Sequence, residues 1–495
     1  MGPRKYYNGD VFEQLQEMYA KLEAQEQRMS ELSEYSDRKI NTLTEELADA
    51  RKEIADLKEE NQLLKDDNER LKRIINNDSN NSSNPPSTDN KSKRANTYNN
   101  RQPSEKKKGG QPGHKGHTLT KEDISRKIKN GELREEVINI GNKSANPTLR
   151  PIEKYIIDIE VNTVAKKYCF YADESGKYNI PKEFQSDVIY GDKLKALTVD
   201  LYCEGIISND RIMELINGIT GNTLKLSAGS VYRFCKEFAA KSSSSIDSIR
   251  EDIMNAEVAH TDASFISTNG KQTYIRTVGT ERSVVYYYTP KKTIKELEQT
   301  GLINSFAGIF VHDHETSMYH FGTGHAECNV HILRYLRKNS EETSNNWSSR
   351  MSKFLCGLND RQKVHVRDNT AFTDAEIAQI ESEYDTIIRM GFEENSKTYG
   401  KLARSEELTL LNRLTKYKAN HLLFTHNLNV PFSNNLSERD LRKTKGRQKM
   451  SGGFRSNEGA SMYCSILSVV ETCKRRNLDL LDSIETIFRT KATVF

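Results

Sequence analysis

The chain has few of the features that mark secreted or membrane proteins. Its seven cysteines are scattered over 495 residues without a Cys-x-x-Cys pair, which argues against a disulfide framework and a ribbon-type zinc site. It has no apolar run close to the roughly 18 residues of a membrane span. It also has no signal-peptide pattern. Neither a membrane nor a secreted role is therefore expected, and a reducing cytoplasm fits this composition.

Hydrophobic residues are scarce as well. They make up 35% of the chain, against 29% for charged residues, so a large part of the chain should be extended, solvated or coiled. A chain of this length exceeds one compact core and should hold about three units. The net charge of +4 is small, so the distribution of charge along the sequence is more informative than its sum.

Residues 1–75 are predicted to form a parallel coiled-coil dimer. Positions a and d of a heptad repeat are occupied by Ile40, Leu43, Leu47, Ala50, Ile54, Leu57, Asn61, Leu64, Asn68, Leu71 and Ile75. Each acid at position g precedes, by five residues, a base at position e, as in the pair Glu46 and Arg51. Asparagine at position a favours dimers in fixed register. A solvated single helix is the alternative.

Residues 76–120 read as a disordered basic linker. The polar tract NNDSNNSSNPPSTDN cannot bury enough apolar surface to fold alone. The basic arm that follows, Lys91 to His117, has eight Lys or Arg against one acid, Glu105. Such an arm attracts polyphosphate, and the affinity falls steeply with salt. A merely soluble linker is the alternative.

Two further units are expected before the middle of the chain. In residues 121–190, the alternation along YIIDIEV (Tyr155 to Val161) predicts a strand in a small strand-bearing domain. In residues 191–252 the pattern predicts two helices around a break at Gly218 to Asn222, the second capped by Ser227. This resembles a helix-turn-helix with Ser230, Tyr232 and Arg233 on the second helix. Two packed helices without DNA contact are the alternative.

Residues 253–336 carry the most informative pattern. A strand from Glu257 to Asp262 is followed by Asn269-Gly270, a strong hairpin signal, and by two further strands. KKTIKELEQTGL is predicted to be a helix, and GIFVHDHE a strand that ends at Asp313. Three antiparallel strands, a helix and a fourth strand form an RNase-H-like α/β order. In that order Asp262 and Asp313 lie side by side.

Adjacent carboxylates resist joint ionisation, and a hard divalent cation relieves the conflict. Mg²⁺ takes oxygen ligands, and two ions about 4 Å apart clamp the attacking and leaving oxygens of a phosphoryl displacement. Glu438 stands at the start of a run that holds seven Lys or Arg and one acid, Asp440, between Arg439 and Arg455. If Glu438 is a third metal ligand, the bound cation separates its negative charge from the phosphates, which explains an acid at this position. A helical ion pair with Arg442 is the local alternative.

Several segments resemble the insertion-sequence-66 family of DDE transposases. They are NSSNPPS, GGQPGHKGH, HTDAS, GIFVHDHETSMY with HAECNVHILRYLR, and PFSNNLSERDLRKTKGRQKMSGGFRSNEGA. The resemblance implies an acidic triad of Asp262, Asp313 and Glu438 that holds two Mg²⁺ ions, with Mn²⁺ able to substitute. It implies cleavage and strand transfer of DNA at transposon ends and target, in a bacterial cytoplasm near the nucleoid.

The resemblance also frames the remaining expectations. DNA contacts are expected from Lys106, Lys107, Lys108, Arg334, Arg439, Arg442, Lys445, Arg447, Lys449 and Arg455. Residues 337–420 correspond to a helical insertion, with one helix over Thr373 to Met390, and residues 421–495 to the second part of the catalytic core. The family usually has Asp-Glu-Thr at the first acid, where this chain has Asp262-Ala263-Ser264. The alternative function is an inactive, domesticated DNA-binding coiled-coil protein.

Two cysteine-related expectations complete the interpretation. The family commonly carries paired cysteines in the domain before the helices, whereas this chain has only Cys169 there, so a degenerate domain without zinc is expected. His325, Cys328 and His331 form a Cys-x-x-His pattern that can bind zinc. Because all three would lie on about two turns of one helix and lack a fourth ligand, helix packing with Arg334 pointing outward is the preferred interpretation.

Overall fold

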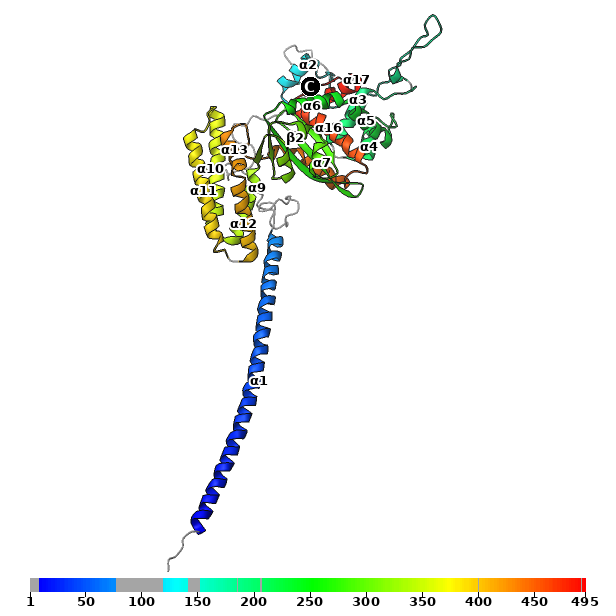
Figure 1. Cartoon of the computed structure of the whole chain (residues 1–495). Coiled ribbons are helices and arrows are strands. Elements are labelled where there is room, and N and C mark those ends of the chain that lie inside the picture. The colour runs from blue at the N-terminus through cyan, green and yellow to red at the C-terminus, as the bar shows by residue number, and fades with distance from the viewer. Residues whose placement is uncertain are drawn as a thin grey trace, which may run out of the picture.

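The computed structural model describes residues 9–76, 119–140, 152–184, 186–204, 207–398, 400–490 and 492–495. Figure 1 shows a long N-terminal helix that extends away from a body containing a sheet, with a bundle of helices to one side of that sheet. None of the helices in these ranges is long and apolar enough to cross a membrane.

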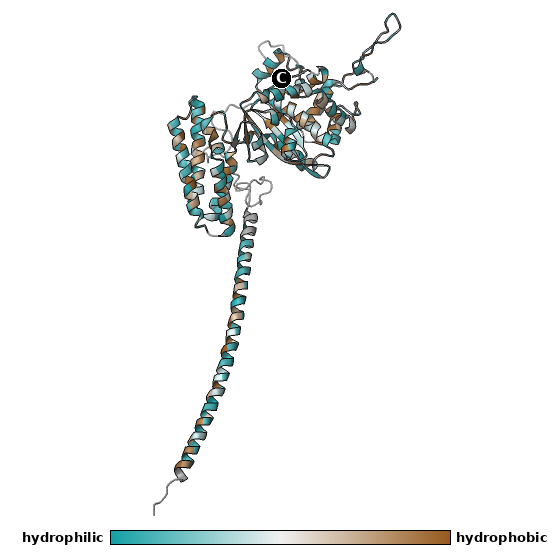
Figure 2. Cartoon of the chain, in the orientation of Figure 1, coloured by the Kyte–Doolittle hydropathy of each residue, from teal (hydrophilic) through white to brown (hydrophobic). Residues whose placement is uncertain are grey.

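The N-terminal helix α1 spans Gly9–Asn76 and is continuous. Its apolar a and d side chains are open to solvent in the single chain: Ile40, Leu47 and Leu57 are each more than half exposed. Figure 2 shows hydrophobic residues interspersed among hydrophilic ones along the coloured part of this helix. The predicted helix is confirmed, whereas its pairing with a second copy stays a prediction.

The strand expected over Tyr155 to Val161 does not form. The chain has a short helix, α2 (Lys121–Lys129), capped by Thr120 and Asp123, and then residues 152–171 without regular structure. Ile156 and Ile159 are largely exposed in this stretch. The prediction was wrong because an alternating sequence forms a strand only beside a second strand with which it can exchange hydrogen bonds. No described strand lies beside these residues. A short 3-10 turn, Lys182–Phe184, follows.

The helical region that follows consists of four helices: α3 (Asp192–Glu204), α4 (Asn209–Ile219), α5 (Ala228–Lys241) and α6 (Ser243–Met254). The predicted break falls between α4 and α5, and Ser227 caps α5 by accepting a hydrogen bond from the Ser230 amide. Ser230 is itself buried, and its hydroxyl bonds Ser227 and Arg233. Because α5 packs against α3, α4, α16 and α17, Ser230 is not available to read bases.

The sheet has five strands in the order β3-β2-β1-β4-β5. They are β1 (Val258–Thr268), β2 (Lys271–Gly279), β3 (Val284–Thr289), β4 (Ile309–His312) and β5 (Gly324–Glu327). The first three are antiparallel, while β4 runs parallel to β1 and β5 runs parallel to β4. Asn269 and Gly270 join β1 to β2 with positive φ angles of 51° and 72°, as a type I′ turn requires.

The connection from β3 to β4 differs from the single helix expected. It holds two short helices, α7 (Ile294–Glu298) and α8 (Leu302–Ser305). Gly301, with φ of 73°, separates them, because this left-handed conformation ends the first helix. A 3-10 turn, Thr316–His320, then lies between β4 and β5.

Helices cover both faces of the sheet. One face packs Ile266, Ile275 and Tyr286 against α3, α5, α16 (Asn457–Arg475) and α17 (Leu480–Thr490). The other face packs Ala259, Val278 and Phe310 against α6, α7 and α8. Helix α16 also covers the edge strand β3, where the Tyr286 amide donates to the Ser468 hydroxyl at 2.9 Å. This contact satisfies a strand edge that would otherwise be open to pairing.

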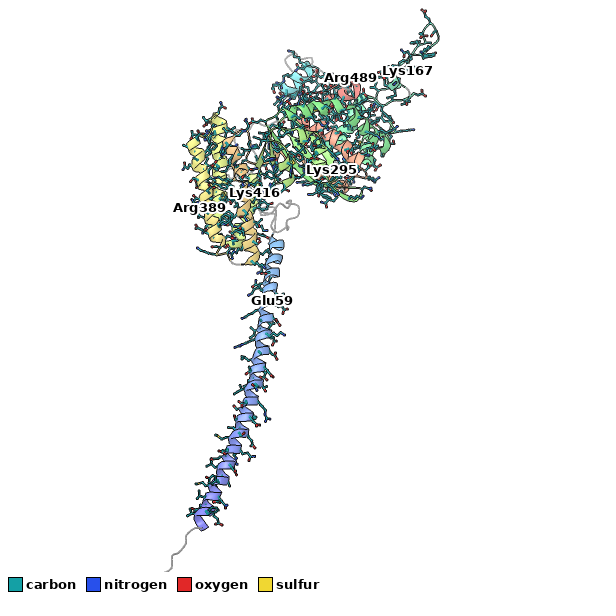
Figure 3. The ribbon with its side chains drawn as sticks, in the orientation of Figure 1. Glu59, Lys167, Lys295, Arg389, Lys416 and Arg489 are labelled. Carbon is teal, nitrogen blue, oxygen red and sulfur yellow. The ribbon has the colours of Figure 1, made fainter. Side chains whose placement is uncertain are left out.

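A bundle of five helices is inserted after β5: α9 (Asn329–Thr343), α10 (Asn346–Asp368), α11 (Asp374–Asn395), α12 (Lys401–Lys416) and α13 (Lys418–His426). Helix α11 confirms the helix predicted from Thr373. Figure 3 shows Arg389 and Lys416 on this bundle. Its core surrounds Trp347, whose indole nitrogen donates to the buried Glu407 at 2.6 Å. The chain then returns to β1 through α14 (Asn435–Asp440) and α15 (Arg442–Ser451).

Candidate metal centre

The two parallel strands bring two acids to the same level of the sheet. In the ladder between β1 and β4, His260 lies opposite Val311. Asp262 and Asp313 each follow two residues later, Asp262 within β1 and Asp313 directly after β4. The hydrogen-bond register of the sheet therefore sets these carboxylates beside each other, as the strand order predicted.

Glu438 reaches the same place from helix α14, which Asn434 anchors. Asn434 is fully buried, and its amide nitrogen donates to the Thr261 carbonyl at 2.9 Å. Its side-chain oxygen lies 3.0 Å from Nδ1 of His260, and its backbone N–H donates to Sγ of Cys328 at 3.2 Å. These bonds hold the start of α14 against β1. The sequence analysis did not predict a role for Asn434. Its position four residues before Glu438 places both residues on the same side of a helix, and this spacing could have identified it.

Four side chains converge at this point: Asp313, Cys328, His331 and Glu438 each offer one ligand atom, and these atoms all lie within 4.8 Å of one another. Nδ1 of His331 is 3.3 Å from Oδ1 of Asp313 and 3.9 Å from Oε1 of Glu438. All three of these atoms are buried, and none makes a well-directed hydrogen bond. Such unpaired buried atoms are costly, and their convergence fits a bound cation.

Asp262 lies next to this cluster, and the pKa values of Asp262 and Asp313 shift in opposite directions. Burial and the neighbouring charge of Asp313 raise the pKa of Asp262 to about 6. Burial also acts to raise the pKa of Asp313, but contact with the His331 imidazole outweighs it, and the pKa is lowered. The pKa values of the two adjacent carboxyl groups therefore move apart: burial and a like charge raise that of Asp262, and the imidazole of His331 lowers that of Asp313.

The oxygen donors of Asp262, Asp313 and Glu438 suit a hard divalent cation such as Mg²⁺ or Mn²⁺. Cys328 does not suit this role. Burial raises the pKa of its thiol, and its sulfur already accepts the Asn434 N–H. The carboxylates are therefore the residues that could hold the metal, with His331 beside them.

The expectation that His325, Cys328 and His331 lie on one helix is wrong. His325 belongs to β5, Cys328 is the N-cap of α9, and only His331 lies within α9. Nδ1 of His325 contacts Nε2 of His312 at 3.3 Å, outside the acidic cluster. The short strand β5 was missed because HAECNVH reads as continuous helix. Of these three residues, Cys328 and His331 belong to the cluster of possible ligands, and His325 does not.

Half of the predicted basic residues are on the surface: Arg439, Arg442, Lys445, Lys449 and Arg455 are exposed. In the described part of the chain no ion pair joins Glu438 to Arg442, because the helix is broken at Leu441 between α14 and α15. Lys445 and Lys292 are close enough to Asp262 to act against the rise of its pKa. Lys292, which donates to the Ala263 carbonyl at 3.3 Å, was missed by the sequence analysis.

Two of the residues predicted to contact DNA make contacts within the fold. The Arg447 guanidinium lies over the rings of Tyr202, Phe454 and Tyr463, with 4.4 Å to the first ring centre, and is partly buried. Arg334 does not point outward, because its Nη1 lies 3.1 Å from Nε2 of His331. Both side chains are occupied within the fold. Lys106, Lys107 and Lys108 fall outside the described residues.

Comparison with known families identifies the class of protein to which the chain belongs. The Transposase IS66 family matches residues 187–462, more than half of the chain. The chain therefore belongs to the Transposase IS66 family, which supports a transposase role and DNA binding. A family of unknown function matches residues 36–120. Among curated proteins, none matches the chain.

Proposed function

We propose that the protein is a DDE-type transposase whose Asp262, Asp313 and Glu438 bind two Mg²⁺ ions, with Mn²⁺ able to substitute. The observation that carries the proposal is the convergence of buried, unpaired oxygens of Asp313 and Glu438 beside Asp262. The strand order β3-β2-β1-β4-β5, with β4 parallel to β1, supports an RNase-H-like core.

The acidic residues are proposed to bind the metal ions, and the basic residues to bind DNA. Bound divalent cations would activate a water or a DNA 3′-hydroxyl and stabilise the leaving oxygen. The register of the sheet fixes the positions of Asp262 and Asp313. The position of Glu438 is fixed by Asn434, which holds the start of α14 against β1. Ala263 occupies a position where the family usually has an acid, so the first motif contributes one carboxylate, that of Asp262.

DNA is proposed to lie along α14 and α15, where Arg439, Arg442, Lys445, Lys449 and Arg455 are exposed. Contacts to phosphate position a nucleic acid without reading its sequence. The basic arm around Lys106, Lys107 and Lys108 would add affinity that falls with salt. Transposon ends and target DNA are the expected partners, and α1 is expected to pair two protomers.

The alternative is a DNA-binding protein without catalysis, which would retain the basic surface and the helix α1. The two proposals differ in one respect: an inactive protein has no need for three carboxylates at one point. Asp262, Asp313 and Glu438 are all present, which favours the enzyme.

The test is strand cleavage of a labelled duplex, taken from the DNA that flanks the gene, with Mg²⁺ or Mn²⁺. Asp262→Asn, Asp313→Asn and Glu438→Gln should abolish cleavage, because an amide is a far poorer ligand for Mg²⁺. DNA binding without metal should survive or tighten, since a negative charge beside phosphate is removed.

The matched control is Glu458→Gln, an exposed acid on α16 that pairs with Lys236 and lies outside the cluster. It should cleave at the wild-type rate. A Glu438→Gln protein that nicks normally would contradict the role of the third acid. A wild-type protein that binds DNA but cleaves with neither metal would favour the inactive alternative.

A further inference from the structure

The imidazole of His331 lies between the acidic cluster and an arginine. Its Nδ1 faces Asp313 and Glu438, at 3.3 Å and 3.9 Å. Its other nitrogen, Nε2, lies 3.1 Å from Nη1 of Arg334, which is one turn further along α9. A guanidinium has five N–H donors and no acceptor, so a hydrogen bond between these two atoms has Nε2 as its acceptor. With Nε2 as acceptor, the ring proton is on Nδ1, the atom that faces the two carboxylates.

We infer that His331 is a positioning residue for the metal centre, and that Arg334 fixes its tautomer. In this arrangement the Nδ1–H edge of the ring faces the Asp313 carboxylate at 3.3 Å and the Glu438 carboxylate at 3.9 Å, and its attraction for both keeps them aimed at one point. The inference rests on the proposed function, because it assigns a role to a neighbour of the proposed metal ligands. It differs from a ligand role, in which Nδ1 would offer a lone pair.

Hydrogen bonds hold the backbone that carries His331 in place. His331 is buried in the first turn of α9, and its backbone N–H donates to the Cys328 carbonyl at 3.2 Å. Nearby, the Asn329 backbone N–H donates to the Phe432 carbonyl, and the Asn329 side chain donates to the His421 carbonyl. These bonds connect the start of α9 to the segment before Glu438 and to helix α13.

A ligand role conflicts with Arg334. Binding a metal through Nδ1 would move the ring proton to Nε2, where it would point at the guanidinium donor 3.1 Å away. Two donors would then face each other without an acceptor. Imidazole nitrogen also suits transition metals better than Mg²⁺, so a ligand role should shift the preference of the site toward Mn²⁺. A positioning role should leave that preference unchanged.

The experiment measures dissociation constants of the full chain for Mg²⁺ and Mn²⁺ by calorimetry, without DNA. Residues that orient metal ligands typically contribute about 10–100-fold in metal affinity. His331→Ala should therefore weaken both metals by about tenfold or more, and by equal factors. His331→Asn should restore both affinities to within about threefold of wild type, because the asparagine amide can place an N–H where Nδ1–H was. The rate of DNA cleavage should fall in the same order as the metal affinity: wild type, then His331→Asn, then His331→Ala.

Arg334→Met removes the donor that fixes the tautomer and should raise the Mn²⁺-over-Mg²⁺ preference, because Nδ1 is then free to ligate. Arg337→Met, on the next part of α9, is the control and should match wild type. If His331→Ala weakens Mn²⁺ far more than Mg²⁺, or if His331→Asn fails to restore affinity in a protein with a normal melting temperature, the inference is overturned. Because metal affinity is read without DNA, a wild-type protein that fails to cleave leaves this test valid.

Discussion

Arg413 on α12 of the inserted bundle forms a buried ion pair with Glu327 at the end of β5, with Nη2 2.6 Å from Oε2. The Glu327 side chain is fully buried and also accepts from Tyr319, from His314 at 2.7 Å and from His421 at 3.2 Å. His314 directly follows Asp313, and Cys328 directly follows Glu327. The pair therefore connects the inserted bundle to the two segments that build the metal centre.

Breaking this pair should destabilise the protein strongly. Arg413→Met leaves the buried carboxylate of Glu327 without its cation, and removing one partner of a buried pair typically costs about 3–5 kcal/mol. Lys363→Met is the control, because its pair with Asp360 on α10 is exposed and worth less than about 1 kcal/mol. Urea unfolding of both variants measures the difference. Equal midpoints for the two variants would show that Glu327 is satisfied by its other partners.

Acid should destabilise the fold through His312. Burial and the neighbouring His325 lower the pKa of His312 from 6.5 to about 4. The folded state resists protonation while the unfolded state does not, so the stabilisation is complete above about pH 6.5 and is lost as the pH falls toward 4. A shift of this size corresponds to about 3 kcal/mol. Urea midpoints between pH 7 and pH 4.5 measure the loss.

His312→Gln is the variant that assigns this loss to one residue. It should be less stable at pH 7, because the site is shaped for imidazole, but its midpoint should fall less steeply with acid. Buried His260 and His421 and partly buried His325 also have lowered pKa values and will contribute their own share of the slope. An unchanged slope in His312→Gln would show that His312 is not the source of the acid sensitivity.

The sequence predicted the parts of the fold that local chemistry determines. Asn269-Gly270 defined a hairpin because only such residues accept positive φ at both turn positions. The apolar face of α11 followed from its helical period, since Ile380, Tyr384 and Ile387 are all buried. The adjacency of Asp262 and Asp313 followed from strand order.

The parts that were missed depend on partners distant in the sequence. The strand expected at Tyr155 has no neighbour to pair with among the residues that the structure describes, although its alternation is good. Arg447 was grouped with the surface bases because its charge is visible in the sequence, whereas the three rings that enclose it are not. The part played by His331 depends on Asp313 and Glu438, which come from two other elements.

Helix α1 should pair two protomers in parallel. Full-length protein is expected to sediment as a dimer or a larger assembly at micromolar concentration, because Ile40, Leu47 and Leu57 would otherwise stay exposed. Replacing Asn61 and Asn68 together by Ile should raise the melting temperature of the assembly while loosening its subunit number, since buried asparagines fix register at a cost in stability. A wild-type chain that sediments as a monomer would contradict the pairing.

Lys445 and Arg447 provide a matched test of the basic surface, because they lie two residues apart on α15 in different surroundings. Lys445 is exposed and close enough to Asp262 to influence its pKa, whereas the Arg447 guanidinium is packed over Tyr202. Lys445→Ala should weaken binding to DNA of any sequence and reduce the slope of log affinity against log salt by about 0.9, with an unchanged melting temperature. Arg447→Ala should instead lower the melting temperature, because it removes cation–π contacts worth about 2 kcal/mol when desolvated. Fluorescence anisotropy across a salt series and thermal unfolding separate the two effects. If Arg447→Ala has a normal melting temperature but binds DNA more weakly, Arg447 contacts DNA and does not act mainly in packing.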